Sequence, residues 1–223
     1  MLIVYIHGAT ATAQSFNYIR NSVKGPDLLL EYDSENGFQN NLDAMGKSIA
    51  EYPDQALFFI GHSLGGIYAL SLAEIFSQRT YGGVTISTPY GGSEVAPFLK
   101  YFVPFNKLLK EIGPTSPPII HAAEIVLSVP WCNLVTTRGS SPWISIPNDG
   151  VVTVESQRKH PGFDYINIVA NHYEVLMDPE TVFIVQARIK QAQSLSLAQL
   201  IQQVTEKSLQ SVKLLDKDNG YHD

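Results

Sequence analysis

Apolar and polar positions along the chain follow two alternating patterns. Short runs rich in β-branched and aromatic residues predict strands, and longer stretches with apolar residues at every third or fourth position predict helices. Strands are predicted over residues 2–8, 27–33, 56–61, 83–88, 133–138 and 165–170. Helical spacing covers residues 39–51, 64–78 and 179–192.

Several of the predicted strands are apolar at consecutive positions rather than at alternate ones, which indicates that both faces of the sheet are covered. Strands that alternate with helices form parallel sheets, because each helix carries the chain back across the sheet. We therefore predict an α/β fold of about six mainly parallel strands with helices on both faces. The length of 223 residues fits a single domain over residues 1–223.

The section over residues 93–130 does not follow this alternation. Six prolines interrupt two apolar segments rich in aromatic and aliphatic side chains. A long excursion between two strands is usually a functional element, so we predict an inserted cap here.

Residues 193–223 extend beyond the last of these helices. Apolar side chains at Leu197, Leu200, Ile201 and Val204 predict an amphipathic helix. We expect this C-terminal extension to pack on the body or on a partner protein that the sequence does not identify. Its balanced charge, without a basic face, disfavours a membrane anchor.

The composition is that of a folded globular protein, with 44% hydrophobic and 16% charged residues. The formal net charge is −6 and the sequence has no obvious basic stripe, so nucleic acid is not expected as a partner. Cys132 is the single cysteine and cannot form an internal disulfide. Its apolar neighbours predict a buried side chain rather than a reactive one.

The chain shows no sign of membrane insertion or classical secretion. No apolar stretch reaches the roughly 18 residues that a membrane span requires. The first residues, "MLIVYIHG", are typical of a strand rather than of a signal peptide. We expect a cytoplasmic protein without a transmembrane segment, and export by a signal-independent route stays open.

The stretch "FFIGHSLGG" at residues 58–66 places Ser63 between glycines two positions away on either side. A strand that ends at Gly61 and a helix that begins after Ser63 require a very tight turn, which flanking glycines permit. The pattern GxSxG is a weak signal alone, but here it has the strand before it and the helix after it that the motif requires. We predict that Ser63 is a nucleophile, the alternative being a helix N-cap.

A serine hydroxyl needs a general base within hydrogen-bond reach, and that base needs an acid to orient it. His172 follows the strand over residues 165–170, at the end of the sheet where open α/β folds place their sites. His7 and His62 adjoin the glycine turns and are expected to support the site by hydrogen bonding. The other histidines lie in the cap, before a proline and in the tail: His121, His160 and His222.

The acid is expected between the strand over residues 133–138 and His172. Asp149 lies in a loop next to Gly150, the alternative being a simple Asn-Asp-Gly turn. Asp164 is the rival, but it lies at the start of the following strand, toward the opposite edge of the sheet. Asp33 and Asp178 would break the order serine, acid, histidine.

Attack on a carbonyl carbon creates an oxyanion that requires prepositioned N–H donors. The amide of Leu64 follows the predicted nucleophile at a helix start, which favours an anion. The second donor should come from the loop that follows "HG", so we predict the amide of Ala9.

Five segments of the chain together resemble the lipase and esterase branch of the α/β-hydrolase superfamily, and they occur in that family's order. They are "YIHGAT", "FIGHSLGG", "STPYGGS", "NDGVVTVES" and "ANHYEVL". The resemblance implies the α/β-hydrolase fold and a cofactor-free serine hydrolase with the triad Ser63, Asp149 and His172. It also implies that residues 93–130 form a helical lid whose apolar side chains bind an acyl group. The alternative is that these side chains pack the segment to the body.

The sequence differs from the usual pattern of this family at its first strands and in its cysteine content. The family usually has two or more strands before the one that bears the HG turn, so a shortened sheet is expected. Some secreted lipases of this branch carry a disulfide and bind calcium. With a single cysteine and no recognisable leader, neither secretion nor a metal site is predicted.

The expected activity is cleavage of a small-molecule ester or lipid, with transient contact to a lipid surface. The same three side chains also serve thioesterases and acyltransferases, and the sequence does not choose among these. A further alternative, from a different class, is a binding protein that keeps the fold without turnover.

Overall fold

Six strands form one sheet in the computed structural model, which describes residues 1–92, 108, 111, 113–141 and 144–218. The strand order is β2-β1-β3-β4-β5-β6, and every neighbouring pair is parallel. The strands are β1 Leu2–Ile6, β2 Asp27–Leu30, β3 Leu57–His62, β4 Thr80–Ile86, β5 Trp131–Thr136 and β6 Asp164–Ile168. The predicted parallel sheet is therefore confirmed.

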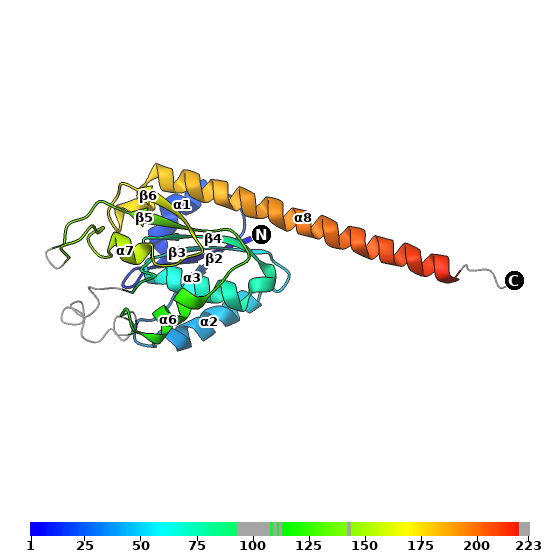
Figure 1. Cartoon of the computed structure of the whole chain (residues 1–223), viewed down its shortest axis with the longest axis horizontal. Coiled ribbons are helices and arrows are strands. Elements are labelled where there is room, and N and C mark those ends of the chain that lie inside the picture. Colours follow the sequence, from blue (N-terminus) through cyan, green and yellow to red (C-terminus); the bar gives the residue numbers. More distant parts are fainter. Residues whose placement is uncertain (93–107, 109–110, 112, 142–143, 219–223) are drawn as a thin grey trace.

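Helices cover both faces of this sheet (Figure 1). The α-helices are α1 Asn17–Ser22, α2 Phe38–Ala50, α3 Leu64–Ile75, α6 Pro117–Glu124, α7 Val154–Gln157 and α8 Pro179–Asp218. Short 3-10 helices are η1 Ala13–Phe16, η2 Ser77–Arg79 and η3 Glu174–Met177.

Alternate residues of β1, which has a neighbouring strand on each side, enter two separate cores, as the period of a strand requires. Val4 and Ile6 join the core that contains side chains of α2, α3 and α6. Ile3 and Tyr5 join the core that contains side chains of α1 and α8. Both faces are thus apolar, which explains why the strands are apolar at consecutive positions.

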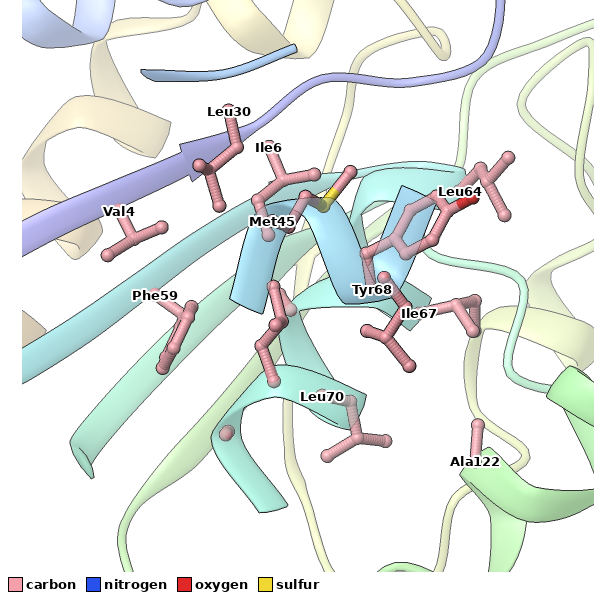
Figure 2. Packing of buried hydrophobic residues seen from close by; sticks show 14 of the residues in the cluster. Val4, Ile6, Leu30, Met45, Phe59, Leu64, Ile67, Tyr68, Leu70 and Ala122 are labelled. Carbon is pink, nitrogen blue, oxygen red and sulfur yellow. The ribbon is translucent and has the colours of Figure 1, made fainter. Parts of the chain in front are cut away.

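The helix α3 is the central helix of the first core. Every residue from Leu64 to Ala73 is buried, because α3 contacts the sheet and also α2 and α6. A helix that is apolar on all sides is expected in such a position. Figure 2 shows Ile67 and Leu70 of α3 in the same cluster as Phe59 of β3.

The predicted strand boundaries differ from the observed ones by up to three residues, and the largest differences are at two strands. The strand predicted over residues 27–33 ends at Leu30, because Glu31 and Tyr32 leave the ladder and contact His7. The strand predicted over residues 83–88 begins at Thr80, and the glycines that follow Tyr81 disfavour a strand by propensity. The short helices α1 and α7 were not predicted, because they have too few turns for a periodic pattern.

The helix α8 is one uninterrupted element of 40 residues. The stretch predicted over residues 179–192 packs on the body through Val185, Ile189 and Ala192. The part of α8 that follows Ala192 extends away from the sheet (Figure 1), and Leu197, Leu200 and Ile201 on it are more than half exposed. Residues 193–218 are thus helical and continuous with the preceding stretch, while residues 219–223 lie outside the described residues.

Part of the predicted cap over residues 93–130 lies outside the described residues, namely 93–107, 109–110 and 112. The described part contains α6, which packs on α3. Ile119 and Ala122 of α6 are buried in the core shared with α3. These two side chains pack α6 against the body of the protein. They therefore have the packing role that the sequence analysis gave as the alternative to binding an acyl group.

Within the described ranges, no helix combines the length and the apolar composition that crossing a membrane requires.

Candidate active site

The turn between β3 and α3 holds Ser63 in a strained conformation. Its φ of 53° and ψ of −125° lie outside the regions that L-residues ordinarily occupy. The Ser63 amide donates to the Ile86 carbonyl at 2.8 Å, which fixes the turn against β4. The Ser63 side chain makes no capping hydrogen bond to α3, so a capping role does not account for this serine.

The glycines around Ser63 are required by close backbone contacts. A Cβ at Gly61 would lie 2.6 Å from the Gly65 carbonyl oxygen, and a Cβ at Gly65 would lie 2.1 Å from the Ile6 carbonyl oxygen. Real Cβ atoms essentially never approach backbone atoms so closely. The GxSxG pattern thus lets the start of α3 pack directly against β1 and β3.

Substituting alanine for Gly65 (Gly65→Ala) is expected to lower the free energy of unfolding by on the order of 3 kcal/mol, since the new methyl group overlaps the backbone of β1. Urea denaturation followed by circular dichroism measures this. Gly46→Ala is the matched control, because a Cβ at Gly46 in α2 meets no atom within 4 Å. That control should be neutral or stabilising by up to about 1 kcal/mol. Equal effects of the two substitutions would contradict the packing argument.

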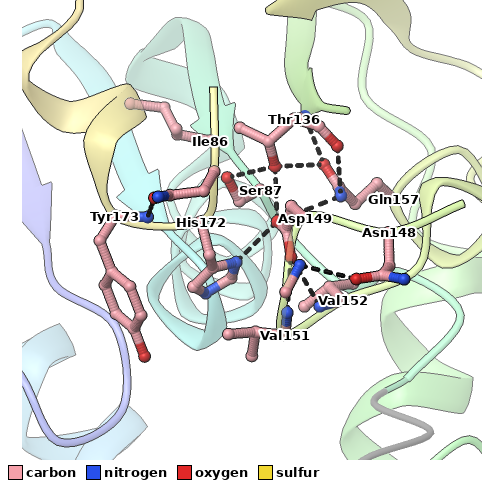
Figure 3. Close-up of polar contacts among 12 residues, drawn as sticks. Ile86, Ser87, Thr136, Asn148, Asp149, Val151, Val152, Gln157, His172 and Tyr173 are labelled. Atoms are coloured by element: carbon pink, nitrogen blue, oxygen red, sulfur yellow. Dashed lines mark hydrogen bonds and ion pairs between the residues drawn. The ribbon is translucent and has the colours of Figure 1, made fainter. Parts of the chain in front are cut away.

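Asp149 and His172 form a buried pair. The His172 Nδ1–H donates to the Asp149 Oδ2 at 2.7 Å (Figure 3), and the two residues are 1% and 2% exposed, respectively. The His172 amide also donates to the Asp149 carbonyl at 3.1 Å. Because Nδ1 carries the proton, Nε2 of a neutral His172 is left as the proton acceptor.

The other oxygen of Asp149 is held by its own loop. Oδ1 accepts from the amides of Val151 at 2.9 Å and Val152 at 2.7 Å. Asn148 closes the turn by accepting from the Gly150 amide at 2.8 Å. The Asn-Asp-Gly turn is therefore present, and the same turn aims Oδ2 at His172.

Opposing effects act on the pKa of Asp149. Burial raises the pKa, but hydrogen bonds from His172, Thr136 and the Val152 amide, together with the charge of His172, outweigh burial and lower it below its ordinary value. The Asp149 carboxylate is thus ionised at neutral pH and can stabilise a positively charged imidazole.

Two buried residues that the sequence analysis did not identify, Thr136 and Gln157, also hold Asp149. The Thr136 hydroxyl donates to Oδ2 at 2.5 Å, and the Gln157 amide nitrogen lies 3.3 Å from the same oxygen (Figure 3). Gln157 Oε1 accepts from the Thr136 amide at 2.8 Å. Ser87, with a φ of 52°, extends the network through a 2.9 Å contact with the Thr136 hydroxyl.

Thr136→Val is expected to lower the free energy of unfolding at neutral pH by about 1.5–3 kcal/mol, the range for a hydrogen bond to a charged group. The lowered pKa of Asp149 means that its stabilising contribution is present above the unfolded pKa of about 4 and is lost as the pH falls through the folded pKa. The difference from wild type should therefore shrink below about pH 4.

Denaturant unfolding at neutral and acidic pH measures this difference. Thr137→Val is the matched control, because the Thr137 hydroxyl donates to a neutral acceptor, the Ile168 carbonyl, at 3.3 Å. The effect of that substitution should be smaller and independent of pH over the same range. A Thr136→Val effect that is equally large in acid would show that Asp149 is not the group involved.

His62 connects the serine turn to the histidine loop. Its Nε2–H donates to the His172 carbonyl at 2.8 Å, and the two rings lie 4.9 Å apart. Burial, followed by the charge of His172, lowers the pKa of His62 to about 3, so the His62 ring is neutral.

No hydrogen bond joins the Ser63 hydroxyl to His172 within the described part of the chain. Catalytic hydrogen bonds are often long before substrate binds.

The two predicted oxyanion donors follow neighbouring strands, Ala9 in the loop after β1 and Leu64 at the start of α3 after β3. Ile6 of β1 pairs with Gly61 of β3, so the loop after β1 runs beside the turn after β3. A Cβ at Gly8 would lie 3.1 Å from the Ser63 Cβ, which shows that the HG turn touches the serine. Leu64 is the first residue of α3 and follows Ser63 in sequence. Ala9 follows Gly8, whose backbone lies against Ser63 in space.

The remaining candidates lie elsewhere. Asp164 is at the start of β6 and pairs with Arg188 at 2.8 Å. His121 pairs with Glu74 on the surface. The buried His160 stacks on Phe163 and contacts the Ile125 carbonyl. His222 lies outside the described residues.

A cavity of about 520 Å³ lies beside His172. This volume is in the range of small-molecule sites. Arg138 and Glu174 form an ion pair in its wall. The lining residues are Arg138, Gly139, Ser140, Asp149, Gly150, Val151, Asn171, His172, Tyr173 and Glu174.

In the part of the chain that is described, no group of three or more His, Cys, Asp or Glu side chains is arranged to hold a metal ion.

Comparison with solved structures identifies the fold. A lipase from Bacillus licheniformis is 16% identical with a TM-score of 0.58, and the match covers 84% of this chain and 90% of the lipase. A metagenomic carboxyl esterase is 16% identical with a TM-score of 0.65, covering 89% of this chain and 76% of the esterase. This chain has the α/β-hydrolase fold. No family model matches the sequence, and neither does any curated protein.

A phospholipase from Legionella pneumophila also shares this α/β-hydrolase fold, at 12% identity and a TM-score of 0.64, over 88% of this chain and 62% of the phospholipase. Within the α/β-hydrolase fold of this chain, the three predicted side chains follow the carboxyl ends of parallel strands. Ser63 follows β3, Asp149 lies in the loop after β5, and His172 follows β6. Open α/β sheets place their ligand sites at this edge.

Proposed function

We propose that this protein is a serine hydrolase that cleaves carboxylic esters through an acyl-enzyme intermediate. The observation that carries the proposal is the 2.7 Å contact between Asp149 and His172, beside the strained turn that holds Ser63. A buried carboxylate that orients an imidazole next to a serine is the arrangement that activates a hydroxyl nucleophile. The backbone strain at Ser63 supports a functional role for this serine.

The mechanism assigns one role to each side chain. The Ser63 hydroxyl attacks the ester carbonyl while His172 Nε2 accepts its proton, and Asp149 stabilises the resulting imidazolium. The amides of Leu64 and Ala9 donate to the oxyanion. As the intermediate collapses, the alcohol leaves with the proton from His172. A water molecule, activated by His172, then releases the acid and regenerates Ser63.

The substrate class that we propose is an apolar acyl or lipid ester. The segment over residues 93–130 is rich in aromatic and aliphatic side chains and is the proposed lid. The cavity beside His172 would take part of the substrate. Solved proteins of the same fold include a lipase, a carboxyl esterase and a phospholipase, which supports ester chemistry here.

The test is a panel of p-nitrophenyl esters with acyl chains from acetyl to palmitoyl, measured beside the matching coenzyme A thioesters. The proposal predicts turnover of the esters, with kcat/KM rising as the acyl chain lengthens. A strong preference for the thioesters would identify a thioesterase or acyltransferase instead. No turnover of either series by folded protein would favour a binding protein.

A further inference from the structure

The loop that carries the Ala9 amide is fixed through the side chain of His7. His7 follows β1 directly, and its Nδ1 lies 2.8 Å from the Gly8 carbonyl oxygen. A carbonyl oxygen only accepts hydrogen bonds, so Nδ1 carries a proton and donates to it. His7 is 2% exposed, so water has little access to compete for this contact.

This hydrogen bond, together with a longer one that the same carbonyl accepts from the Ala11 amide at 3.2 Å, sets the direction of the next amide. The peptide between Gly8 and Ala9 is planar and trans, as are all described peptides, so its C=O and N–H point in opposite directions. When the Gly8 carbonyl is held by His7, the Ala9 N–H is turned to the other side. The Gly8 backbone lies against Ser63, so the orientation of this peptide matters to the nucleophile.

His7 is in turn held by two residues that follow β2. Its ring stacks on Tyr32 with the centroids 4.3 Å apart and the planes 6° apart. The Tyr32 hydroxyl donates to the His7 carbonyl at 3.0 Å. Glu31 Oε2 lies 2.9 Å from His7 Nε2, off the direction of a hydrogen bond, so the carboxylate borders the ring on the side opposite Gly8.

Glu31 also holds the far end of the same loop. Its other oxygen, Oε1, accepts from the Ala13 amide at 2.8 Å. One carboxylate therefore contacts the residue before Gly8 and the first residue of η1, and the loop over residues 8–12 runs between these two contacts. Thr10 in this loop has a φ of 61°, so the loop is in a conformation that local preference does not favour.

We propose that Glu31 is a positioning residue that, through His7, aims the Ala9 amide at the oxyanion. The inference rests on the proposed function, because it requires an oxyanion at this site. The Glu31 side chain is 57% exposed, so solvent screens its charge and its contacts add little to folding stability. Its two contacts therefore point to the geometry of the loop rather than to the stability of the fold.

The experiment compares Glu31→Ala and Glu31→Gln with wild type, using p-nitrophenyl butyrate and an alkyl boronic acid inhibitor that mimics the tetrahedral intermediate. Removal of an oxyanion donor lowers kcat by about 10²–10³-fold. A misaimed donor should cost less, so Glu31→Ala is expected to lower kcat by roughly 10- to 100-fold. The KM should stay nearly constant, and boronic acid affinity should fall by a similar factor.

Glu31→Gln is expected to be less severe, because the amide oxygen of the substituted side chain can still accept from the Ala13 amide while the negative charge beside His7 is lost. The matched control is Asp27→Asn at the start of β2, which removes the partly exposed 2.8 Å ion pair with Arg20. This control should leave both kcat and boronic acid affinity unchanged. Thermal unfolding of each variant establishes that the protein is folded.

Two results would overturn the inference. A folded Glu31→Ala variant with the kcat and boronic acid affinity of Asp27→Asn would show that Glu31 does not act on the oxyanion. A rise in KM alone would assign Glu31 to substrate binding instead. Failure of the proposed function gives a different result, because the wild-type protein itself would then hydrolyse no ester. That result would also refute the proposed role of Glu31.

Discussion

Ser63→Ala is expected to lower kcat for ester hydrolysis by about 10³- to 10⁶-fold, because the nucleophile is removed while the oxyanion donors and the binding surface remain. The fold should persist, since the Ser63 side chain makes no capping hydrogen bond to α3. Rates on a p-nitrophenyl ester, together with thermal unfolding, measure both properties.

Ser63→Gly provides a control for this substitution. A residue in the backbone conformation of Ser63 costs on the order of 1–3 kcal/mol, and glycine relieves part of that cost. We therefore expect Ser63→Gly to be as inactive as Ser63→Ala and to unfold at a higher temperature. If Ser63→Ala kept activity within about tenfold of wild type, Ser63 would not be the nucleophile.

Asp149→Asn is expected to lower kcat by about 10⁴-fold at neutral pH. An asparagine that turns its amide nitrogen toward His172 would hold the imidazole in the wrong tautomer, with its proton on Nε2, where it cannot accept the serine proton. The hydrogen bonds of the Asp149 loop favour this geometry, because the Val151 and Val152 amides donate to Oδ1 and so keep the remaining oxygen of an asparagine on their side. Steady-state kinetics across neutral pH measure the loss.

Asp164→Asn is the matched control for Asp149→Asn. Asp164 is the rival to Asp149 as the acid, its side chain is 60% exposed, and it pairs with Arg188. Because this pair lies at the start of β6, its loss should change kcat by less than about twofold. A larger loss in Asp164→Asn than in Asp149→Asn would refute the assignment of the acid.

The fold could be predicted because its signals are local. Both faces of the sheet are buried, so the strands read as apolar runs, and the turn at Ser63 needs glycines for steric reasons that the sequence displays. The order of serine, acid and histidine led to Asp149 and His172, which lie 2.7 Å apart in the structure. The fold predicted from these signals is confirmed by the sheet order and by the solved structures that share it.

The support around the acid could not be predicted, because it depends on contacts between distant segments. Gln157 lies on the short helix α7, and only the fold brings its side chain to Thr136 and Asp149. Thr136 gave a weaker signal, as a polar residue at the carboxyl end of a strand. The role of Glu31 could not be predicted for the same reason. Its contacts to His7 and Ala13 join the end of β2 to the loop after β1.

The central claim is that Ser63 is activated by His172, and labelling of the native protein with a fluorophosphonate probe tests this most directly. The account predicts one covalent adduct, located on Ser63 by mass spectrometry of the digested protein, that is absent in Ser63→Ala and strongly slowed in His172→Gln. A folded wild-type protein that stays unlabelled, or that carries the adduct on a different serine, would contradict it.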